Sequence, residues 1–386
     1  MPLPVTPRRD AWPAPDPETR STEASRLVAE GLDRLERGEP GAAATALAQA
    51  LEHDATLPEV WFYLGVARKN GGELGLSVGH LRRCLELAPD YPPAWFELAD
   101  ALDQLGDTHG AVATYRRAVE LDAQLFAGWN NLGNAYATLE QNENAVDCYT
   151  TALEIRGDRY EVWFNLGQAL AALGLDERAE TAYRRALESD SDNSRLHYNL
   201  GYALSCRGEL RAAIRSYRRA TEIDPRDHHA WYNLGNVYSD LGRFVDAVEA
   251  YRRALGHRRE DHEAWNNLGN ALTQLGRGGE ALGCYRQALW LAPDYDAAWN
   301  NLGSALEEAG NLPGAERAYA RAIEIEPCRP TYYLNRASVL ARSEREREAI
   351  EQIVEAVQIA PEVRCLLPAF DEFRGLLQDP KLRNLP

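Results

Sequence analysis

The sequence predicts an all-α protein built as a stack of helical hairpins, and three periodic features of its 386 residues lead to that prediction. A tryptophan returns every 34 residues, at Trp61, Trp95, Trp129, Trp163, Trp231, Trp265 and Trp299, with His197 in the remaining place. Glycine and alanine each recur at two further places in the same frame. A fixed period of this length is typical of stacked repeats, so we expect an array rather than one globular core.

Ten units share this frame, and their first positions fall at Ala24, Pro58, Pro92, Phe126, Tyr160, Ser194, His228, His262, Asp296 and Pro330. Positions 4, 7, 8 and 11 follow helical spacing and predict an apolar face on a first helix, with Trp231 in its core. Positions 20, 24 and 27 predict a second helix in the same way. Small residues at positions 8 and 20 allow the two helices to approach closely. Glycine at position 15 lies between them, where the end of a helix favours a left-handed residue.

The pattern W-x2-L-G-x2-Y…A-x3-Y-x2-A…P resembles the tetratricopeptide repeat (TPR), and the string WNNLGNAY at 129–136 is close to the consensus of that family. The resemblance covers residues 24–363, and it is strongest to long arrays such as the TPR region of O-GlcNAc transferases. It implies a right-handed α-solenoid of ten helix–turn–helix units. The two end repeats depart from the pattern, as capping units do, for example with Leu27 in place of tryptophan and Arg336 in place of leucine.

Both ends of the chain are expected to differ from the repeats. Residues 1–23 are rich in proline and are expected to form a disordered arm. Residues 364–386 are expected to form a C-terminal capping helix that ends at Asp379-Pro380, because apolar side chains recur there at helical spacing. These are Leu366, Leu367, Phe370, Phe373, Leu376 and Leu377. The segment after the last repeat is too short for an enzyme domain.

Composition narrows the class of protein further. The formal net charge is -17 and the pI is near 5.0, which disfavours nucleic acid and anionic membranes as partners. No apolar run approaches the ~18 residues of a membrane span, and the first residues do not resemble a signal peptide. The six cysteines have no paired spacing, which favours reduced thiols and a cytoplasmic location.

Positions 2, 6, 9 and 13 of the first helix lie opposite its packed face, because successive residues are about 100° apart around a helix. In the family that the chain resembles, this face lines the concave inside of the superhelix. Asparagine occupies position 6 in seven consecutive repeats and position 9 in three. These asparagines are Asn131, Asn165, Asn199, Asn233, Asn267, Asn301, Asn335, Asn134, Asn236 and Asn270. Asparagine is a poor helix former, so an unbroken row of it requires a reason.

We interpret the row as a peptide-binding ladder, since a carboxamide offers a hydrogen-bond donor and an acceptor to the backbone of an extended peptide. Similar asparagine ladders hold extended peptides in the TPR superhelices of O-GlcNAc transferases. The alternative is a role in local packing, because asparagine at position 6 is common in the repeat consensus. The sequence leaves both interpretations open.

Charge on the same face bears on the ligand. Its acidic residues are Glu36, Glu59, Glu97, Asp100, Glu161, Asp240, Glu263 and Glu308, whereas its basic residues are Arg195 and Arg342. A groove of this sign favours neutral or basic peptides, although the acids also fit a merely solubilising role. The face lacks the cluster of lysine and arginine expected of repeats that grip a C-terminal carboxylate.

We assign no binding or catalytic role to the other sequence patterns. Arginine pairs at positions 25 and 26 are mostly followed by glutamate at helical spacing, which is typical of a solvated face. His228, His229, His257 and His262 have no supporting metal motif, and no phosphate loop, nucleophile elbow or carboxylate dyad occurs. We therefore expect no metal, no cofactor and no catalytic residue.

The sequence thus predicts a non-catalytic scaffold that binds an extended, neutral to basic peptide segment of a partner protein in its groove. Two alternatives stay open. In the first alternative, the chain is a substrate-recruiting subunit of a separately encoded enzyme, such as a glycosyltransferase. In the second, it is a structural protein that assembles with further copies of itself.

Overall fold

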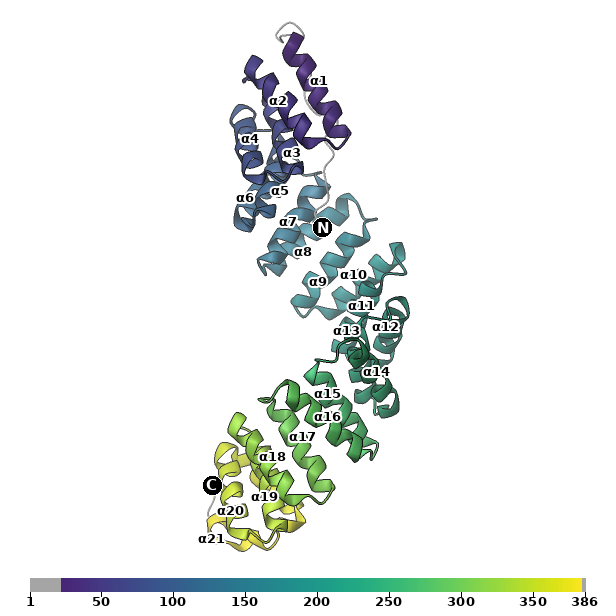
Figure 1. Cartoon of the computed structure of the whole chain (residues 1–386), viewed down its shortest axis with the longest axis vertical. Coiled ribbons are helices and arrows are strands. Elements are labelled where there is room, and N and C mark those ends of the chain that lie inside the picture. The colour runs from purple at the N-terminus through teal and green to yellow at the C-terminus, as the bar shows by residue number, and fades with distance from the viewer. Residues whose placement is uncertain (1–21, 384–386) are drawn as a thin grey trace. The chain divides into compact units, whose positions relative to one another are not determined.

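The computed structural model describes residues 22–383, which contain helices and no strand. Contacts divide the chain into two compact units, the first ending at Ala203 and the second beginning at Leu204. In each unit, antiparallel helical hairpins follow one another in the order of the sequence (Figure 1). The disordered arm expected for residues 1–23 lies outside the described residues, apart from its last two.

The helix boundaries repeat with the 34-residue frame. The first unit contains α1 (Thr22–Glu36), α2 (Pro40–His53), α3 (Pro58–Asn70), α4 (Leu74–Leu87), α5 (Pro92–Gln104), α6 (Thr108–Leu121), α7 (Phe126–Thr138), α8 (Asn142–Ile155), α9 (Tyr160–Ala172) and α10 (Asp176–Ser189). The boundary between the units falls within α11 (Ser194–Cys206). The second unit continues with α12 (Leu210–Ile223), α13 (His228–Asp240), α14 (Phe244–His257), α15 (His262–Gln274), α16 (Gly278–Leu291), α17 (Asp296–Glu308), α18 (Leu312–Ile325), α19 (Pro330–Arg342) and α20 (Glu346–Ile359). Odd-numbered helices are the first helices of the repeats, and even-numbered helices are the second.

Position 15 ends each first helix in the left-handed conformation. Eight glycines at this position have φ between 69° and 85°, for example Gly106 and Gly276. The other two repeats place Glu140 and Glu344 there, with φ of 57° and 61°. The prediction of a left-handed residue between the helices is confirmed, and two repeats adopt it without the residue that tolerates it best.

Glycine at position 8 sets the distance between the two helices of a hairpin. A Cβ atom added at Gly269 would lie 2.5 Å from the ring of Tyr285, and one added at Gly133 would lie 2.7 Å from the ring of Tyr149. The tyrosines at position 24 are consequently buried against the first helix. The expectation that small residues permit a close approach is confirmed.

The tryptophans at position 4 are half-buried, so placing Trp231 in the core was wrong, whereas Leu234 and Gly235 beside it are buried. The Trp231 indole Nε1 donates a 3.0 Å hydrogen bond to the carbonyl oxygen of Pro225, six residues earlier in the loop between repeats. The same bond forms from Trp61, Trp95, Trp129, Trp163, Trp265 and Trp299. His197 and Tyr333 reproduce it with their own polar atoms. Tryptophan recurs here because it combines apolar area with a donor that reaches the loop.

The chain after α20 does not form the single capping helix that the sequence predicted. It forms three 3-10 helices, η2 (Pro361–Ala369), η3 (Asp371–Phe373) and η4 (Leu376–Gln378), followed by α21 (Pro380–Arg383). Pro368 lies inside η2, where it lacks the N–H that a continuous α-helix needs, and Pro380 begins a helix instead of ending one. Leu367, Phe373 and Leu376 nevertheless pack on the last hairpin, as expected of a cap.

Candidate functional site

The asparagine row lies on first helices, and neighbouring first helices touch one another within each unit. In the first unit α7 contacts α9, and in the second unit α13, α15, α17 and α19 contact one another in sequence. We call the surface that these helices form within each unit the first-helix face of that unit. Side chains at positions 6 and 9 of successive repeats meet there, across the junction between two repeats.

The same arrangement of hydrogen bonds forms separately at three of these junctions. At the junction of repeats 4 and 5, the Tyr149 hydroxyl donates to Asn134 Oδ1 over 2.8 Å, and Asn165 Nδ2 donates to the same oxygen over 3.0 Å. We call this arrangement of one tyrosine and two asparagines a clasp. The clasp therefore joins both helices of one repeat to the first helix of the next.

Two further clasps occur in the second unit. Asn236 Oδ1 accepts from Tyr251 and Asn267 at the junction of repeats 7 and 8. Asn270 Oδ1 accepts from Tyr285 and Asn301 at the junction of repeats 8 and 9, over 2.9 and 3.0 Å. The predicted site residues at position 9 are thus all clasp centres, and three of those at position 6 are their partners.

Residues at position 5 add bonds at the junctions of repeats 7 and 8, 8 and 9, and 9 and 10. Asn267 Nδ2 donates to the Tyr232 hydroxyl, Asn301 Nδ2 donates to Asn266 Oδ1, and Asn335 Nδ2 donates to the oxygen of Asn300 over 2.8 Å. The sequence analysis did not include position 5 in the predicted row and missed this role. The offset of 35 residues from position 5 of one repeat to position 6 of the next was the available signal.

The rest of the predicted row is not uniform. Asn131 is buried and accepts a 3.0 Å bond from Asn130. Asn199 Nδ2 donates to the backbone oxygen of Arg195 in its own helix. Asn233 also has a partner within the chain. These three asparagines and Asn335 are not clasp members, so the structure brings together only part of the ladder.

Each clasp uses one polar atom of each amide. In the part of the chain that the structure describes, nothing donates to the Oδ1 atoms of Asn165 and Asn301, and nothing accepts from the Nδ2 atoms of Asn134 and Asn270. The clasps at junctions 4/5 and 8/9 thus leave one donor and one acceptor unused, from two different repeats.

A cavity of about 380 Å³ lies beside the clasp of repeats 4 and 5. Asn134, Tyr149, Asn165 and Gln168 line it, together with Asn142 and Thr138. The cavity is polar because amides and hydroxyls form most of its wall. The clasp amides of Asn134 and Asn165 thus form part of the wall of this cavity.

The acidic residues predicted for this face divide into two groups. Glu97 and Asp100 are buried, with 4% and 7% of their surface exposed, and Lys69 Nζ lies between them, 2.5 Å from Glu97 Oε2. Lys69 occupies position 12, so the sequence analysis of the face left it out. These two carboxylates form an internal charge cluster and were wrongly predicted as groove charge.

Burial and charge act in opposite directions within this cluster. Burial raises the pKa of Glu97 above its ordinary value, and the nearby Lys69 ammonium does not fully offset that effect. Burial lowers the pKa of Lys69, but the two carboxylates outweigh it and the net pKa is raised. The lysine is therefore held in its charged form.

Of the remaining acids, Glu59 is also buried, with 4% of its surface exposed, so it too was wrongly predicted as groove charge, whereas the others lie nearer the surface. Glu161 forms an ion pair with Arg159 at 3.3 Å, and Glu263 accepts a hydrogen bond from the Tyr232 hydroxyl. Asp240 and Glu308 are exposed. The first-helix face keeps an acidic character, but with fewer free carboxylates than the sequence indicated.

The described residues contain no group of three or more histidine, cysteine, aspartate or glutamate side chains placed to hold a metal ion. The buried thiols of Cys84, Cys148 and Cys284 have raised pKa values, mainly because of burial, about 12 for Cys84 and about 11 for Cys284. Such thiols stay protonated and unreactive at neutral pH. No helix among residues 22–383 has both the length and the apolar character required to cross a membrane.

Hairpins of this kind, stacked in one frame and joined by side-chain contacts between neighbours, define a repeat protein of the helical interaction-scaffold class. A family model described as tetratricopeptide repeat matches residues 28–92, 130–194, 177–227, 198–256, 232–296 and 267–330, and a second, described as TPR repeat, matches residues 99–140. The chain belongs to the tetratricopeptide repeat family. Members of this family typically serve as protein-interaction scaffolds.

Solved structures of repeat proteins resemble parts of the chain. The crystal structure of YrrB, described as a TPR protein with an unusual peptide-binding site, is 26% identical, with a TM-score of 0.44 over 49% of this chain and 98% of that one. A crystal structure of MamA is 24% identical, with a TM-score of 0.42 over 44% of this chain and 92% of that one. Naa15/Naa10 bound to HypK-THB is 14% identical, with a TM-score of 0.46 over 90% of this chain and 65% of that one. No curated protein matches the chain.

Proposed function

We propose that this chain is a non-catalytic scaffold that binds an extended peptide segment of a partner protein along its first-helix face. The observation that carries the proposal is the pair of unused amide atoms at the clasps, one donor and one acceptor, with a cavity beside the first of them. A peptide backbone offers the complementary pair at every residue.

The spacing of the repeats supports an extended ligand. Neighbouring packed helices lie ~8–10 Å apart, and an extended chain advances ~3.3 Å per residue. One repeat therefore corresponds to about three residues of ligand. Only the residues of the peptide that lie opposite a clasp contact its amides. The side chains of the other residues make no contact with the amides.

The charge of the face bears on the ligand in a secondary way. The exposed Asp240 and Glu308 favour a neutral or basic peptide, as the sequence predicted, whereas Glu97 and Asp100 contribute little because Lys69 is paired with both. Backbone contacts select an extended conformation, and charge selects among sequences.

The test begins with a random peptide library displayed on phage and selected on the full-length chain. A selected peptide is then synthesised with a methyl group on one backbone nitrogen at a time, and each version is measured by fluorescence anisotropy. We expect the affinity to fall only where the methylated nitrogen lies opposite an unused clasp acceptor, Asn165 Oδ1 or Asn301 Oδ1, because the methyl group removes the N–H donor there. Uniform tolerance of the methyl groups would refute backbone recognition.

A blocking variant locates the site. Gln168 is exposed and lines the cavity without taking part in the clasp, so Gln168→Trp should fill the cavity and abolish binding. The matched control is Glu188→Trp, which adds the same side chain to the exposed surface of α10 and should leave binding unchanged. Equal binding by both variants would place the ligand elsewhere on the chain.

A further inference from the structure

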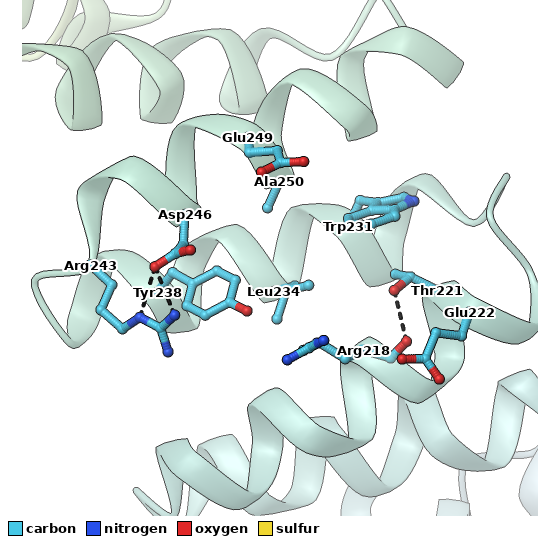
Figure 2. Close-up of a pocket in the computed structure, with 10 residues that line it drawn as sticks. All are labelled: Arg218, Thr221, Glu222, Trp231, Leu234, Tyr238, Arg243, Asp246, Glu249 and Ala250. Atoms are coloured by element: carbon cyan, nitrogen blue, oxygen red, sulfur yellow. Dashed lines mark hydrogen bonds and ion pairs between the residues drawn. The ribbon is translucent and has the colours of Figure 1, made fainter.

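The opposite surface of the repeats, formed mainly by second helices, contains a recurring cavity. Three such cavities have volumes of about 360, 390 and 690 Å³, and the same nine repeat positions line all of them. Figure 2 shows the one at Trp231, which is lined also by Leu234 and Tyr238 of the first helix and by side chains of the second helices on both sides. We call these positions the outer lining set: 4, 7 and 11 of one repeat, 19, 22 and 23 of the same repeat, and 25, 28 and 29 of the repeat before.

Repeat 9 has an exceptional outer lining set. Trp299, Leu302 and Leu306 supply its apolar floor from α17, as in the three cavities. Its charged residues are Arg286 of α16 and Arg317 of α18, and no acidic residue occupies any of the nine positions. By contrast, the set at Trp231 includes Glu222, Asp246 and Glu249, so the charge of the surface reverses between repeats 7 and 9.

The second unusual feature of this set is Trp290, which occupies position 29 of repeat 8. Position 29 is glutamate in seven repeats, namely at Glu52, Glu86, Glu120, Glu154, Glu188, Glu222 and Glu324. In repeat 8 the position holds Trp290, which is 75% exposed, the largest value among the exposed large hydrophobic residues of the described chain. An indole this exposed contributes little to packing inside the repeat, and seven repeats carry an exposed carboxylate in the same place.

The two arginines of the set have no partner among the described residues. In residues 22–383, the side chains of Arg286 and Arg317 form neither an ion pair nor a hydrogen bond. At the equivalent place one repeat earlier, Arg252 pairs with Glu280 at 2.8 Å across the cavity floored by Trp265. Repeat 9 lacks such a bridge because Gly314 stands where Glu280 stands in repeat 8.

We propose that this surface of repeat 9, made by Trp290, Trp299, Arg286 and Arg317, docks an acidic segment of a partner protein that carries an apolar side chain. Charge complementarity identifies the occupant, because two unpaired guanidinium groups flank the apolar floor on a chain whose net charge is -17. The indole of Trp290 covers the apolar side chain, and the arginines bind the carboxylates beside it. This site is independent of the clasps, and it selects ligands of the opposite charge.

The experiment selects a random peptide library on the full-length wild-type chain after depletion on the Trp290→Glu variant. That variant restores the residue most common at position 29, and it changes an exposed side chain, so the fold and the unfolding midpoint should stay the same. We expect the recovered peptides to be rich in aspartate and glutamate around one aromatic or aliphatic residue. Recovery of basic peptides, or of none, would overturn the proposal.

One recovered peptide is then measured by fluorescence anisotropy against three variants. Trp290→Glu should weaken binding by at least about tenfold, and the double variant Arg286→Ala/Arg317→Ala should weaken it and flatten its dependence on salt. The control Glu222→Ala, at the equivalent position of another repeat, should leave the affinity unchanged. Equal affinity of the wild type and Trp290→Glu would refute the site.

Sedimentation velocity separates a partner from a second copy. A wild-type chain that associates with itself more strongly than Trp290→Glu, over a range of concentrations, would mean that the surface joins copies of this chain, which would overturn the proposal. A chain of unchanged mass in both cases, together with peptide binding, would support it. The Gln168→Trp variant, which should lose the peptide that binds at the clasp, should bind the acidic peptide with unchanged affinity. The two proposed sites can therefore be refuted separately.

Discussion

Two junctions between repeats solve the same packing problem with different chemistry. Between repeats 2 and 3, Lys69 bridges the buried carboxylates of Glu97 and Asp100. Between repeats 8 and 9, neutral amides and a hydroxyl form the clasp of Tyr285, Asn270 and Asn301. The charged junction keeps its carboxylates buried around Lys69, with Asp100 Oδ1 left without a hydrogen-bond partner among the described residues, whereas the amide junction leaves a donor and an acceptor unused beside the first-helix face. The difference teaches that only amide junctions can both hold the repeats together and present a surface for a peptide backbone.

Alkaline pH should affect both kinds of junction and produce the largest effect. The tyrosines at position 24 are buried, and burial raises the pKa of Tyr285 to about 12 and that of Tyr115 and Tyr149 as well. Above pH ~10 the unfolded chain loses tyrosine protons that the folded chain retains, so stability falls as pH rises, by about 1.4 kcal/mol per pH unit for each such tyrosine. Circular dichroism and tyrosinate absorbance recorded together should show one transition. Tyrosinate formation near pH 10 in a fully helical chain would contradict this.

Removing the lysine of the charged junction should be the most damaging substitution of a single polar residue. Lys69→Ala leaves two buried carboxylates without their counter-ion, which should cost ~3–5 kcal/mol in the first unit. Hydrogen exchange should locate the loss in α3 to α6. The double variant Lys69→Met/Glu97→Gln leaves one carboxylate and should recover part of the loss. A loss spread evenly over both units would argue against a local role.

Two substitutions of one clasp asparagine test how much its side-chain oxygen contributes to stability. Asn270→Ala leaves Tyr285 and Asn301 without their acceptor and should cost ~1–3 kcal/mol. Asn270→Asp keeps an oxygen at the same place, so urea unfolding should show a smaller loss. Equal losses for the two variants would mean that the bonds to Asn270 Oδ1 contribute little.

The smallest expected effect is a gain in stability. Glu140 and Glu344 hold the left-handed conformation that glycine provides in the other eight repeats. Glu140→Gly should stabilise the chain by about 1 kcal/mol, because glycine adopts a positive φ without a steric penalty. The reverse change, Gly276→Glu, should lower the melting temperature. A lower melting temperature for Glu140→Gly would show that Glu140 makes a compensating contact.

The repeat frame predicted two helices in each repeat, and in the structure α3, α5 and the later first helices of the repeats begin at position 1. The same frame placed the glycines correctly, because their roles depend on backbone geometry within one repeat. It was wrong for Trp231, since a tryptophan at helical spacing is compatible with both a core residue and a donor to a loop. The prediction of a single C-terminal capping helix was also wrong, because it relied on the helical spacing of the leucines and did not account for Pro368.

The clasps could not be derived from a single repeat. Each clasp joins atoms separated by 15 and 31 residues, and the direction of an amide across a junction depends on the neighbouring helix. Lys69 was missed for a similar reason, because it stands outside the four positions expected on the face. The row of asparagines was visible in the sequence, but its division into clasp members and others required the packing of the repeats.

The most direct test of the central claim uses Asn134→Asp at the clasp beside the cavity. The substitution keeps an oxygen for Tyr149 and Asn165 and replaces the unused Nδ2 donor with a second oxygen. For an uncharged peptide selected on the wild-type chain, we predict only the small loss of stability expected of Asn270→Asp, together with a loss of affinity of at least about tenfold. Unchanged affinity, with that small loss of stability, would contradict the claim that clasp amides bind the peptide backbone.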